Sequence, residues 1–183
     1  AKRQGVSEEL LSELDGFTGA VGIWDSGRPG PVTAFRFDID CVQVGETSDP
    51  AHEANAGGYA SERPNLMHAC GHDGHLAVGL GVAQWIKDHA DQLCGKIKLV
   101  FQPAEEGTRG ARPMAESGIL DDVDFIVCTH IGSSVPLHQV AVCTHGYLAT
   151  TKLDIYFEGV PAHAGANPEK GRSALMAACS AAM

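Results

Sequence analysis

The segment HLAVGLGVAQWIKDHADQLCGKIKLVFQP, residues 75–103, decides the fold because it joins a predicted helix to a predicted strand. We expect a helix over residues 75–93 with Asp73 as its N-cap. Residues 96–103 are predicted to form a strand that ends at Pro103, since proline lacks the backbone N–H that a sheet requires. Helices that alternate with strands are typical of α/β proteins.

The same alternation continues on both sides of this segment. Further strands are predicted over residues 17–24, 31–39, 124–131 and 139–146, and further helices over residues 7–15, with Ser7 as N-cap, and 110–120. The strand DFIVCTHI, residues 124–131, has almost no alternation of apolar and polar side chains, which predicts burial on both faces. A long polar loop is expected over residues 41–65. The sequence therefore predicts an α/β fold in which helices flank a sheet.

The character of the sequence changes after residue 148. A strand with true alternation is predicted over residues 149–159, followed by a loop and a helix that runs to Met183. We expect one domain over residues 1–148 and the beginning of a smaller α+β domain over residues 149–183. Because the chain starts at Ala1 without a methionine and stops inside a helix-like run, we expect an interior piece of a longer protein, with both domains incomplete.

Composition excludes several classes of protein. The chain has 44% hydrophobic and 20% charged residues, which is typical of a globular domain, and its net charge is -10. An acidic chain does not favour nucleic-acid binding, and no apolar run approaches the roughly 20 residues of a membrane helix. Six cysteines without a CxxC pair indicate thiols in a reducing compartment rather than a disulfide scaffold, which favours the cytoplasm.

The segment MHACGHDGH, residues 67–75, combines three histidines, a cysteine and an aspartate. Thiolate, imidazole and carboxylate groups are ligands of zinc and similar divalent ions. Cys70 and His72 lie just before the predicted helix, where a short turn can aim both side chains at one point and the helix N-terminus favours a thiolate. Taken alone, however, the segment is explained better by a buried cysteine beside solvated histidines.

Two adjacent carboxylates, Glu105 and Glu106, follow the strand that ends at Pro103. Loops at the carboxyl ends of strands are where α/β proteins bind ligands. One glutamate can bind a metal while the other takes the proton of the water that the metal activates. A solvated acidic turn is the alternative.

Other polar residues lie at comparable positions. His130 follows a predicted buried strand and is either a core histidine or a metal ligand. Asp38 and Asp40 are either partners of a ligand histidine or a polar strand end. His163 lies in a loop of the second domain, where it can close over a substrate and stabilise an oxyanion, or is a surface histidine.

Three of these signals strengthen one another: Cys70 with His72, Glu105 with Glu106, and His130. Each falls at a strand end or a helix start, on one edge of the predicted sheet. A combined metal site would have four ligands and one spare carboxylate as general base. The four ligands are Cys70, His72, Glu106 and His130, and the base is Glu105.

Five motifs occur together in a recognisable order: RFDID (36–40), MHACGHDGH (67–75), FQPAEEG (101–107), CTHIG (128–132) and GVPAHAGANPEKGRSAL (159–175). In order and spacing they resemble the dinuclear-metal amidohydrolases related to aminoacylases and carboxypeptidases. The resemblance runs from about residue 14 to the end. It implies a catalytic domain like that of zinc exopeptidases, a lid or dimerisation domain, and two divalent ions, Mn²⁺ or Zn²⁺.

The resemblance also implies a role for each matched residue. Cys70, His72, Glu106 and His130 match metal ligands, Glu105 matches the general base, and His163 matches a lid histidine that binds the substrate carbonyl. The implied reaction is hydrolysis of the amide bond of a small N-acyl amino acid. The finer match is to the branch that acts on p-aminobenzoyl-glutamate, and the implied assembly is a homodimer or a hetero-oligomer with a related subunit. No residue of this chain matches the last histidine ligand expected from the family.

Three alternatives remain open. The substrate can be another N-acyl amino acid, of the hippurate kind. Cys70 can be a nucleophile with His72 or His130 as its base, which needs no metal. The chain can also be a non-catalytic metal-binding module, in which four ligands close the coordination shell.

Overall fold

The computed structural model describes residues 18–132, 135–142, 149–151 and 153–183. The chain divides into two compact units, residues 1–142 and residues 143–183. The predicted domain boundary at residue 148 falls among residues outside the described ranges.

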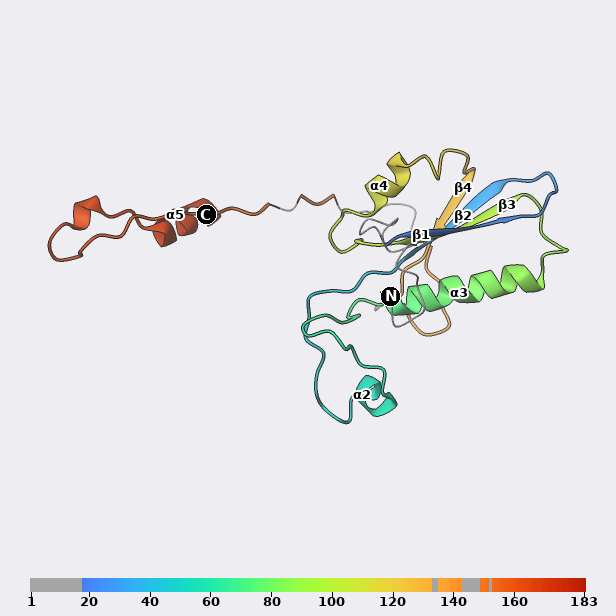
Figure 1. Ribbon diagram of the computed structural model, residues 1–183, viewed down its shortest axis with the longest axis horizontal. Helices are drawn as coiled ribbons and strands as arrows, with labels where there is room; N and C mark the ends of the chain where they lie inside the picture. The colour runs from blue at the N-terminus through green and yellow to red at the C-terminus, as the bar shows by residue number, and fades with distance from the viewer. Residues whose placement is uncertain (1–17, 133–134, 143–148, 152) are drawn as a thin grey trace, which may run out of the picture. The chain divides into compact units, whose positions relative to one another are not determined.

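A four-stranded sheet forms the centre of the first unit (Figure 1). Its strands are β1 (Ala20–Asp25), β2 (Val32–Asp38), β3 (Lys96–Gln102) and β4 (Phe125–Cys128), in the spatial order β1-β3-β2-β4. β2 is parallel to both β3 and β4, whereas β1 is antiparallel to β3. The carboxyl ends of β2, β3 and β4 therefore meet at one edge of the sheet. The predicted sheet with flanking helices is confirmed.

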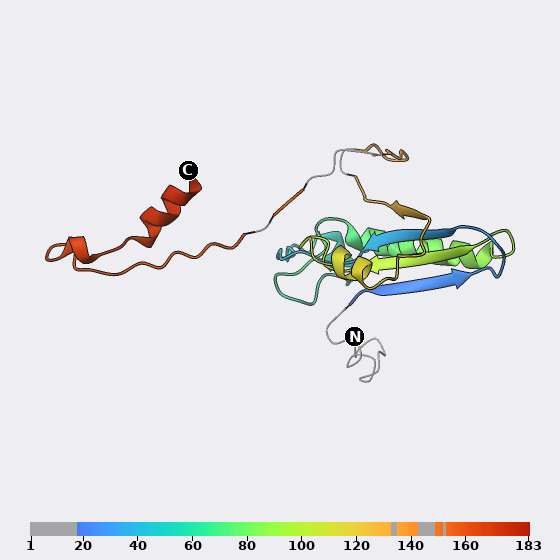
Figure 2. The ribbon, with the colours of Figure 1, turned by 90° about the horizontal axis from the view of Figure 1, so that it is seen from above.

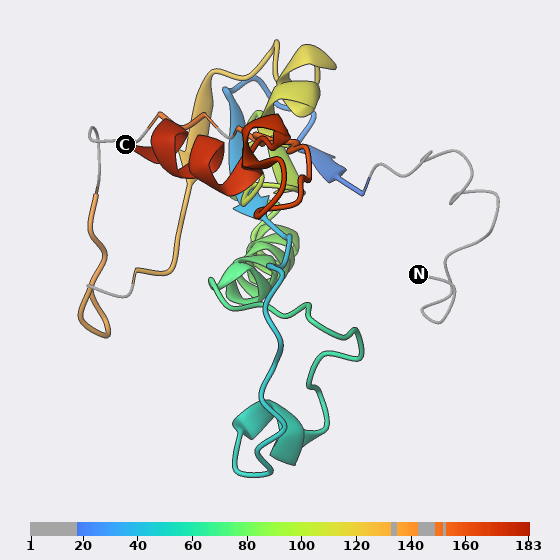
Figure 3. The same cartoon turned by 90° about the vertical axis from the view of Figure 1, so that its left-hand side faces the viewer.

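Helix α3 (His72–Asp88) packs along one face of the sheet, against β2 and β3. The core between them contains the buried side chains Phe37, Ile86, Ile97 and Leu99. The described part of this unit also contains two short helices: α4 (Ala111–Glu116), on the opposite side of the sheet, and α2 (Glu53–Gly57), within the predicted long loop (Figures 1 and 3). In the described part of the chain, no helix combines the length and the apolar composition that crossing a membrane requires.

The prediction that Asp73 caps helix α3 is wrong. The helix begins at His72, and Gly71 is its N-cap with a φ of 134°. That backbone conformation is open to glycine and strained for other residues, so Gly71 allows the chain to turn into the helix earlier than expected. Its carbonyl oxygen accepts the first helical hydrogen bond, 3.1 Å from the backbone nitrogen of His75.

The prediction that strand β4 is buried on both faces is also wrong. β4 lies at the edge of the sheet opposite β1 (Figure 2), and Phe125, Ile126 and Val127 are 63%, 53% and 43% exposed. An apolar strand is buried only where other elements cover it. Among the described residues, β2 is the only strand that pairs with β4.

The second unit contains a single turn of 3₁₀-helix, η2 (Pro168–Lys170), and helix α5 (Ala174–Ala182). No strand occurs over the described part of residues 149–159, contrary to the prediction; an isolated bridge joins Val160 to Arg172. An alternating segment forms a strand only beside a partner strand, and the described residues offer none here. Residues 139–142 are not a strand either, and residues 143–146 and the predicted helix at 7–15 lie outside the described ranges.

Candidate metal centre

The polar residues singled out in the sequence gather where the parallel strands end and helix α3 begins. Asp38 is the last residue of β2, Glu105 and Glu106 follow β3, and His130 follows β4. The turn before α3 adds Cys70, and the first helical residue is His72. The fold thus brings five of the six predicted site residues to one edge of the sheet, as expected for an α/β protein.

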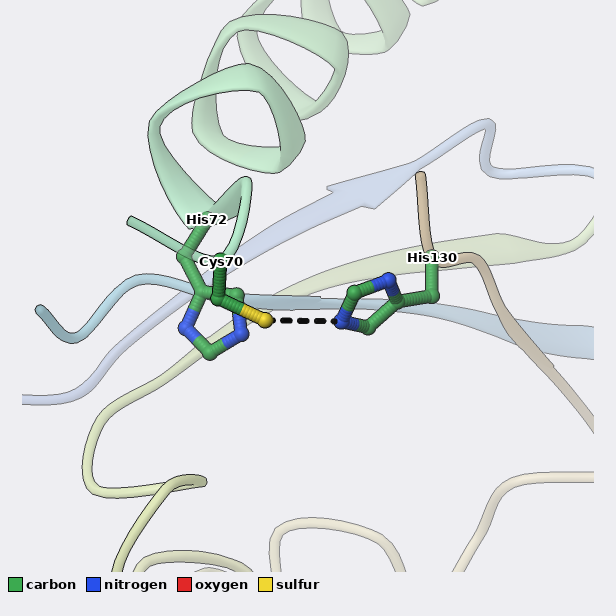
Figure 4. A group of neighbouring side chains, drawn as sticks. All are labelled: Cys70, His72 and His130. Atoms are coloured by element: carbon green, nitrogen blue, oxygen red, sulfur yellow. Dashed lines mark hydrogen bonds between the residues drawn. The ribbon is translucent and has the colours of Figure 1, made fainter. Parts of the chain in front are cut away.

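Cys70, His72 and His130 point toward one another (Figure 4). The Cys70 sulfur lies 3.5 Å from Nε2 of His130. The ligand atoms of these three residues all lie within 4.8 Å of one another, and the same holds for His72, Glu105 and Glu106. Because His72 belongs to both groups, the two sets of ligands share one histidine.

His72 is fully buried and is held through only one of its two ring nitrogens. Its Nδ1 lies 3.0 Å from the backbone oxygen of Asp40 and 3.2 Å from the Asp40 carboxylate, and both of these groups are acceptors. Nδ1 therefore carries a proton, and in the neutral form of the ring Nε2 has a lone pair. This Nε2 has no hydrogen-bond partner within the described residues and lies 3.7 Å from Glu105 and 3.9 Å from Glu106.

His130 is oriented in the same way. Its Nδ1 donates to the backbone oxygen of Ile131 at 2.8 Å, which leaves the lone pair of Nε2 facing the Cys70 sulfur. The imidazoles, the thiol and the two carboxylates thus form two groups of ligand atoms that share His72. A buried lone pair without a donor, such as that on Nε2 of His72, is costly, and a divalent cation bound by either group would satisfy it. The residues present therefore fit a metal ion.

The thiol of Cys70 is not activated by its surroundings. Partial desolvation, a hydrogen bond with Glu106 and the negative charges of Glu106, Glu105 and Asp38 raise its pKa above the ordinary value. A nucleophilic cysteine needs the opposite environment, which lowers the pKa of the thiol. A bound cation would reverse this electrostatic balance and make the sulfur a thiolate ligand.

The carboxylate of Asp40 fixes two parts of the centre. One oxygen accepts from Nδ1 of His72, and the other lies 3.1 Å from the backbone nitrogen of Glu106, which donates to it. Asp38 accepts a hydrogen bond from His75 and lies 3.8 Å from Nε2 of His72. Burial opposes the ionisation of Asp38, yet the hydrogen bond from His75 and the charge of Arg36 hold the pKa of its carboxyl below the usual range. Both aspartates therefore act as orienting partners rather than as a simple polar strand end.

His163 lies in the second unit, in the loop before η2. Its side chain is exposed, and its Nδ1 accepts hydrogen bonds from the backbone nitrogens of Gly165 at 3.2 Å and Ala166 at 3.1 Å. The ring therefore caps its own loop. A role of His163 at the metal centre stays a prediction.

Comparison with known proteins identifies the family to which a chain with this fold and this site belongs. The chain belongs to peptidase family M20/M25/M40, whose model matches residues 34–183. The family expected from the motifs is therefore confirmed.

Particular relatives are closely similar over most of the chain. It is 52% identical to a Haemophilus influenzae homolog of one subunit of p-aminobenzoyl-glutamate hydrolase, over 97% of this chain. It is 52% identical to the indole-3-acetyl-aspartic acid hydrolase of Enterobacter agglomerans and 49% identical to the corresponding p-aminobenzoyl-glutamate hydrolase subunit of Escherichia coli, in both cases over 100% of this chain. The chain spans 42% of the length of each of these relatives.

Solved structures show the same fold. The aminobenzoyl-glutamate utilization protein from Klebsiella pneumoniae has a TM-score of 0.64 and is 39% identical, covering 97% of this chain and 39% of its own. A dinuclear metal binding peptidase of family M20 from Bacillus subtilis has a TM-score of 0.58 and is 35% identical, covering 65% of this chain and 31% of its own.

Proposed function

We propose that this chain carries part of the active centre of a metal-dependent hydrolase that cleaves the amide bond of N-acyl amino acids. The observation that carries the proposal is the buried Nε2 of His72, which has no hydrogen-bond partner among the described residues and lies near a thiol, a second imidazole and two carboxylates. Membership of the M20/M25/M40 family and the names of the similar proteins support it.

The proposed ligands of two divalent ions, Mn²⁺ or Zn²⁺, are Cys70, His72, Glu106 and His130. Bound divalent ions supply Lewis acidity, which lowers the pKa of a water and polarises the amide carbonyl. A catalytic centre of this kind also needs ligand positions that stay open to water and substrate.

Glu105 is the proposed general base. Its carboxylate lies beside the cluster, 3.7 Å from Nε2 of His72, and is more exposed than the histidine. It takes a proton from the attacking water while the water oxygen bonds to the amide carbon. The same proton then passes to the leaving nitrogen as the C–N bond breaks, so the carboxylate is regenerated. We assign stabilisation of the developing oxyanion to His163.

The proposed substrate is p-aminobenzoyl-glutamate, which yields p-aminobenzoate and glutamate. The names of the similar proteins point to p-aminobenzoyl-glutamate and to indole-3-acetyl-aspartate. Both compounds join an aromatic acyl group to an acidic amino acid through an amide. Because the Escherichia coli relative is named as one subunit of its hydrolase, we also propose assembly of the full-length protein with a related subunit or as a homodimer.

Two isosteric variants of the full-length protein test the division of roles between the adjacent glutamates. Glu105→Gln should retain bound metal, and its rate of p-aminobenzoyl-glutamate hydrolysis should fall by a factor of about 10²–10⁴, which is the usual contribution of a general base. Glu106→Gln should lose metal as well as activity. Metal content is measured by atomic spectrometry and product release by chromatography. Full activity of Glu105→Gln would show that the proposed chemistry is wrong.

A cysteine nucleophile is the competing mechanism. It predicts that metal-free protein still hydrolyses the substrate and that a p-aminobenzoyl thioester forms on Cys70, which mass spectrometry would detect. The raised pKa of that thiol argues against it. We expect activity to disappear on chelation and to return with Mn²⁺ or Zn²⁺, with no adduct on Cys70.

A further inference from the structure

His75 is a buried residue to which the proposed reaction assigns no role. It is 1% exposed and lies one helical turn after His72, on the same face of helix α3. Its Nε2 is 2.8 Å from the backbone nitrogen of Ile131, the residue after His130. A backbone N–H can only donate, so Nε2 is the acceptor and the ring proton is on Nδ1, which donates to Asp38.

The carboxylate that receives this proton is itself fixed. The second oxygen of Asp38 lies 2.6 Å from a guanidinium nitrogen of Arg36. Nε of Arg36 donates to the side-chain oxygen of Gln102 at 2.8 Å. A continuous chain of hydrogen bonds thus runs from β3 through β2 to helix α3 and on to the segment after β4. Asp38 and Gln102 are buried, and the charges of Arg36 and Asp38 balance within this chain.

The side chain of Ile131 also lies against the first turn of α3. A Cβ added at Gly74 would lie 2.5 Å from Cδ1 of Ile131, and a Cβ at Gly71 would lie 3.5 Å from its Cβ. The glycines therefore leave the space that Ile131 fills. The ring of His75 also meets the ring of His130 edge-on, with 4.5 Å between centroids.

We propose that His75 is a positioning residue for the metal centre. By joining Asp38 to the backbone of Ile131, it holds the segment after β4 so that Nε2 of His130 faces Cys70 and His72. β4 brings the chain to this edge of the sheet but ends at Cys128, two residues before His130, so the segment that follows the strand needs a further contact to fix it. This inference rests on the proposed metal centre, and the test below separates the two.

The experiment uses the full-length protein with Co²⁺ as a spectroscopic probe. Affinity is measured by competition with a chromophoric chelator, and the Cys70–Co²⁺ charge-transfer band reports the geometry at the sulfur. His75→Asn keeps a donor near Asp38 but is too short to accept from Ile131. We expect Co²⁺ affinity to fall about 10–100-fold and the band to shift, as for other groups that orient metal ligands.

Two comparisons isolate the hydrogen bond to Ile131. His75→Gln places an amide oxygen near the position of Nε2, so it should recover part of the affinity and of the spectrum. His89→Asn is the matched control, because His89 lies at the other end of α3 and contacts Trp85. It should leave both readouts unchanged.

The outcomes are distinguishable. If Cys70→Ser leaves Co²⁺ affinity intact, the proposed metal centre itself is wrong. If Cys70→Ser weakens binding while His75→Asn keeps wild-type affinity and spectrum, only the positioning inference is overturned. A lower unfolding midpoint of metal-free His75→Asn, with unchanged affinity and spectrum of the folded protein, also overturns it.

A second variant keeps the inference testable if His75→Asn does not fold. Gly74→Ala pushes on Ile131 and leaves every polar group in place, and we expect it to shift the Co²⁺ spectrum. Gly81→Ala, in the same helix with nothing within 4 Å of the added carbon, is its control. Identical spectra for these two alanine variants would overturn the positioning inference.

Discussion

Helix α3 approaches the sheet closely at Gly79, and replacing this residue with alanine should destabilise the protein. The added methyl would lie 2.6 Å from Cε1 of Phe101 and 2.9 Å from Cδ2 of Phe37. Both are ring atoms, and the two rings already pack against each other with centroids 5.6 Å apart. The rings therefore have little room to move, so the helix itself must lift from the strands.

Gly81→Ala is the reference variant for the loss of unfolding free energy expected in Gly79→Ala. Gly81 is exposed two residues further along the same helix, and alanine there should stabilise the protein by about 0.5–1 kcal/mol through the backbone alone. Gly79→Ala gains the same helix propensity and bears an overpacking cost of about 1–3 kcal/mol. The free energies of unfolding of the two variants should therefore differ by about 1–3 kcal/mol, because the propensity term cancels.

Urea unfolding of both full-length variants, followed by circular dichroism, measures this difference. Metal-free protein is used, so that metal binding does not add to the stability of the folded state. Equal midpoints and slopes for Gly79→Ala and Gly81→Ala would refute the reasoning, because they would mean that the helix is not pressed against the two rings.

Three further predictions concern the surroundings of the centre. Asp40→Asn replaces one of two carboxylate acceptors with a donor, so metal affinity measured by chelator competition should fall about 10–100-fold. Gly110→Ala places a methyl 1.6 Å from a backbone oxygen and should cost about 1–3 kcal/mol or more in urea unfolding, whereas Gly107→Ala makes only ordinary contacts at 3.5 Å and should be nearly neutral. The hydrogen bond from Lys98 lowers the pKa of Asp122 below 3.8 in the folded protein. The ionised Asp122 carboxylate therefore contributes its full stabilisation above pH 3.8, and this contribution is lost as the pH falls through the pKa of the folded protein. Asp122→Asn should flatten the dependence of the unfolding free energy on pH in this acid range.

The elements that the sequence predicts well are those whose signal is local. The predicted helix at 75–93 and strand at 96–103 differ from α3 and β3 by a few residues at their ends. The error at the start of α3 comes from Gly71, whose positive φ no hydrophobic pattern reports. Helix starts are therefore located less well than helices themselves.

The elements that the sequence predicts poorly depend on distant partners. Residues 125–128 are as apolar as a buried strand, yet they form an exposed edge because, within the described residues, β2 alone pairs with them. Residues 149–159 alternate as a strand does, but the described residues contain no strand beside them. The apolar content of a segment indicates that its side chains can be buried, but it does not predict which other element will cover them.

In the candidate site, too, local features are predicted well and contacts between distant residues are predicted poorly. Residue types and motif spacing single out the proposed ligands and the pair of glutamates. The sequence also indicates Asp38 and Asp40 as partners of a ligand histidine, but which residue each one contacts could not be foreseen, since Asp40 and His72 are 32 residues apart in the sequence. The hydrogen bond between His75 and Ile131, which are 56 residues apart, had no counterpart in the sequence pattern. A weak signal for His75 did exist, because it follows His72 by three residues and so shares its helix face.

The hydrogen bonds around the proposed centre explain how its side chains keep this arrangement without a metal ion. Every ring N–H of His72, His75 and His130 donates away from the common space, to Asp40, Asp38 and the backbone of Ile131 respectively. Arg36 is the cation built into this network, and Asp38 and Gln102 occupy its hydrogen bonds. Among the buried side-chain atoms of the described residues, Nε2 of His72 is the acceptor left without a hydrogen-bond donor, and it lies beside the sulfur and the glutamates. A divalent ion bound at the proposed centre would displace the thiol proton, and the imidazoles would not need to turn, since their other nitrogens already hold them in place.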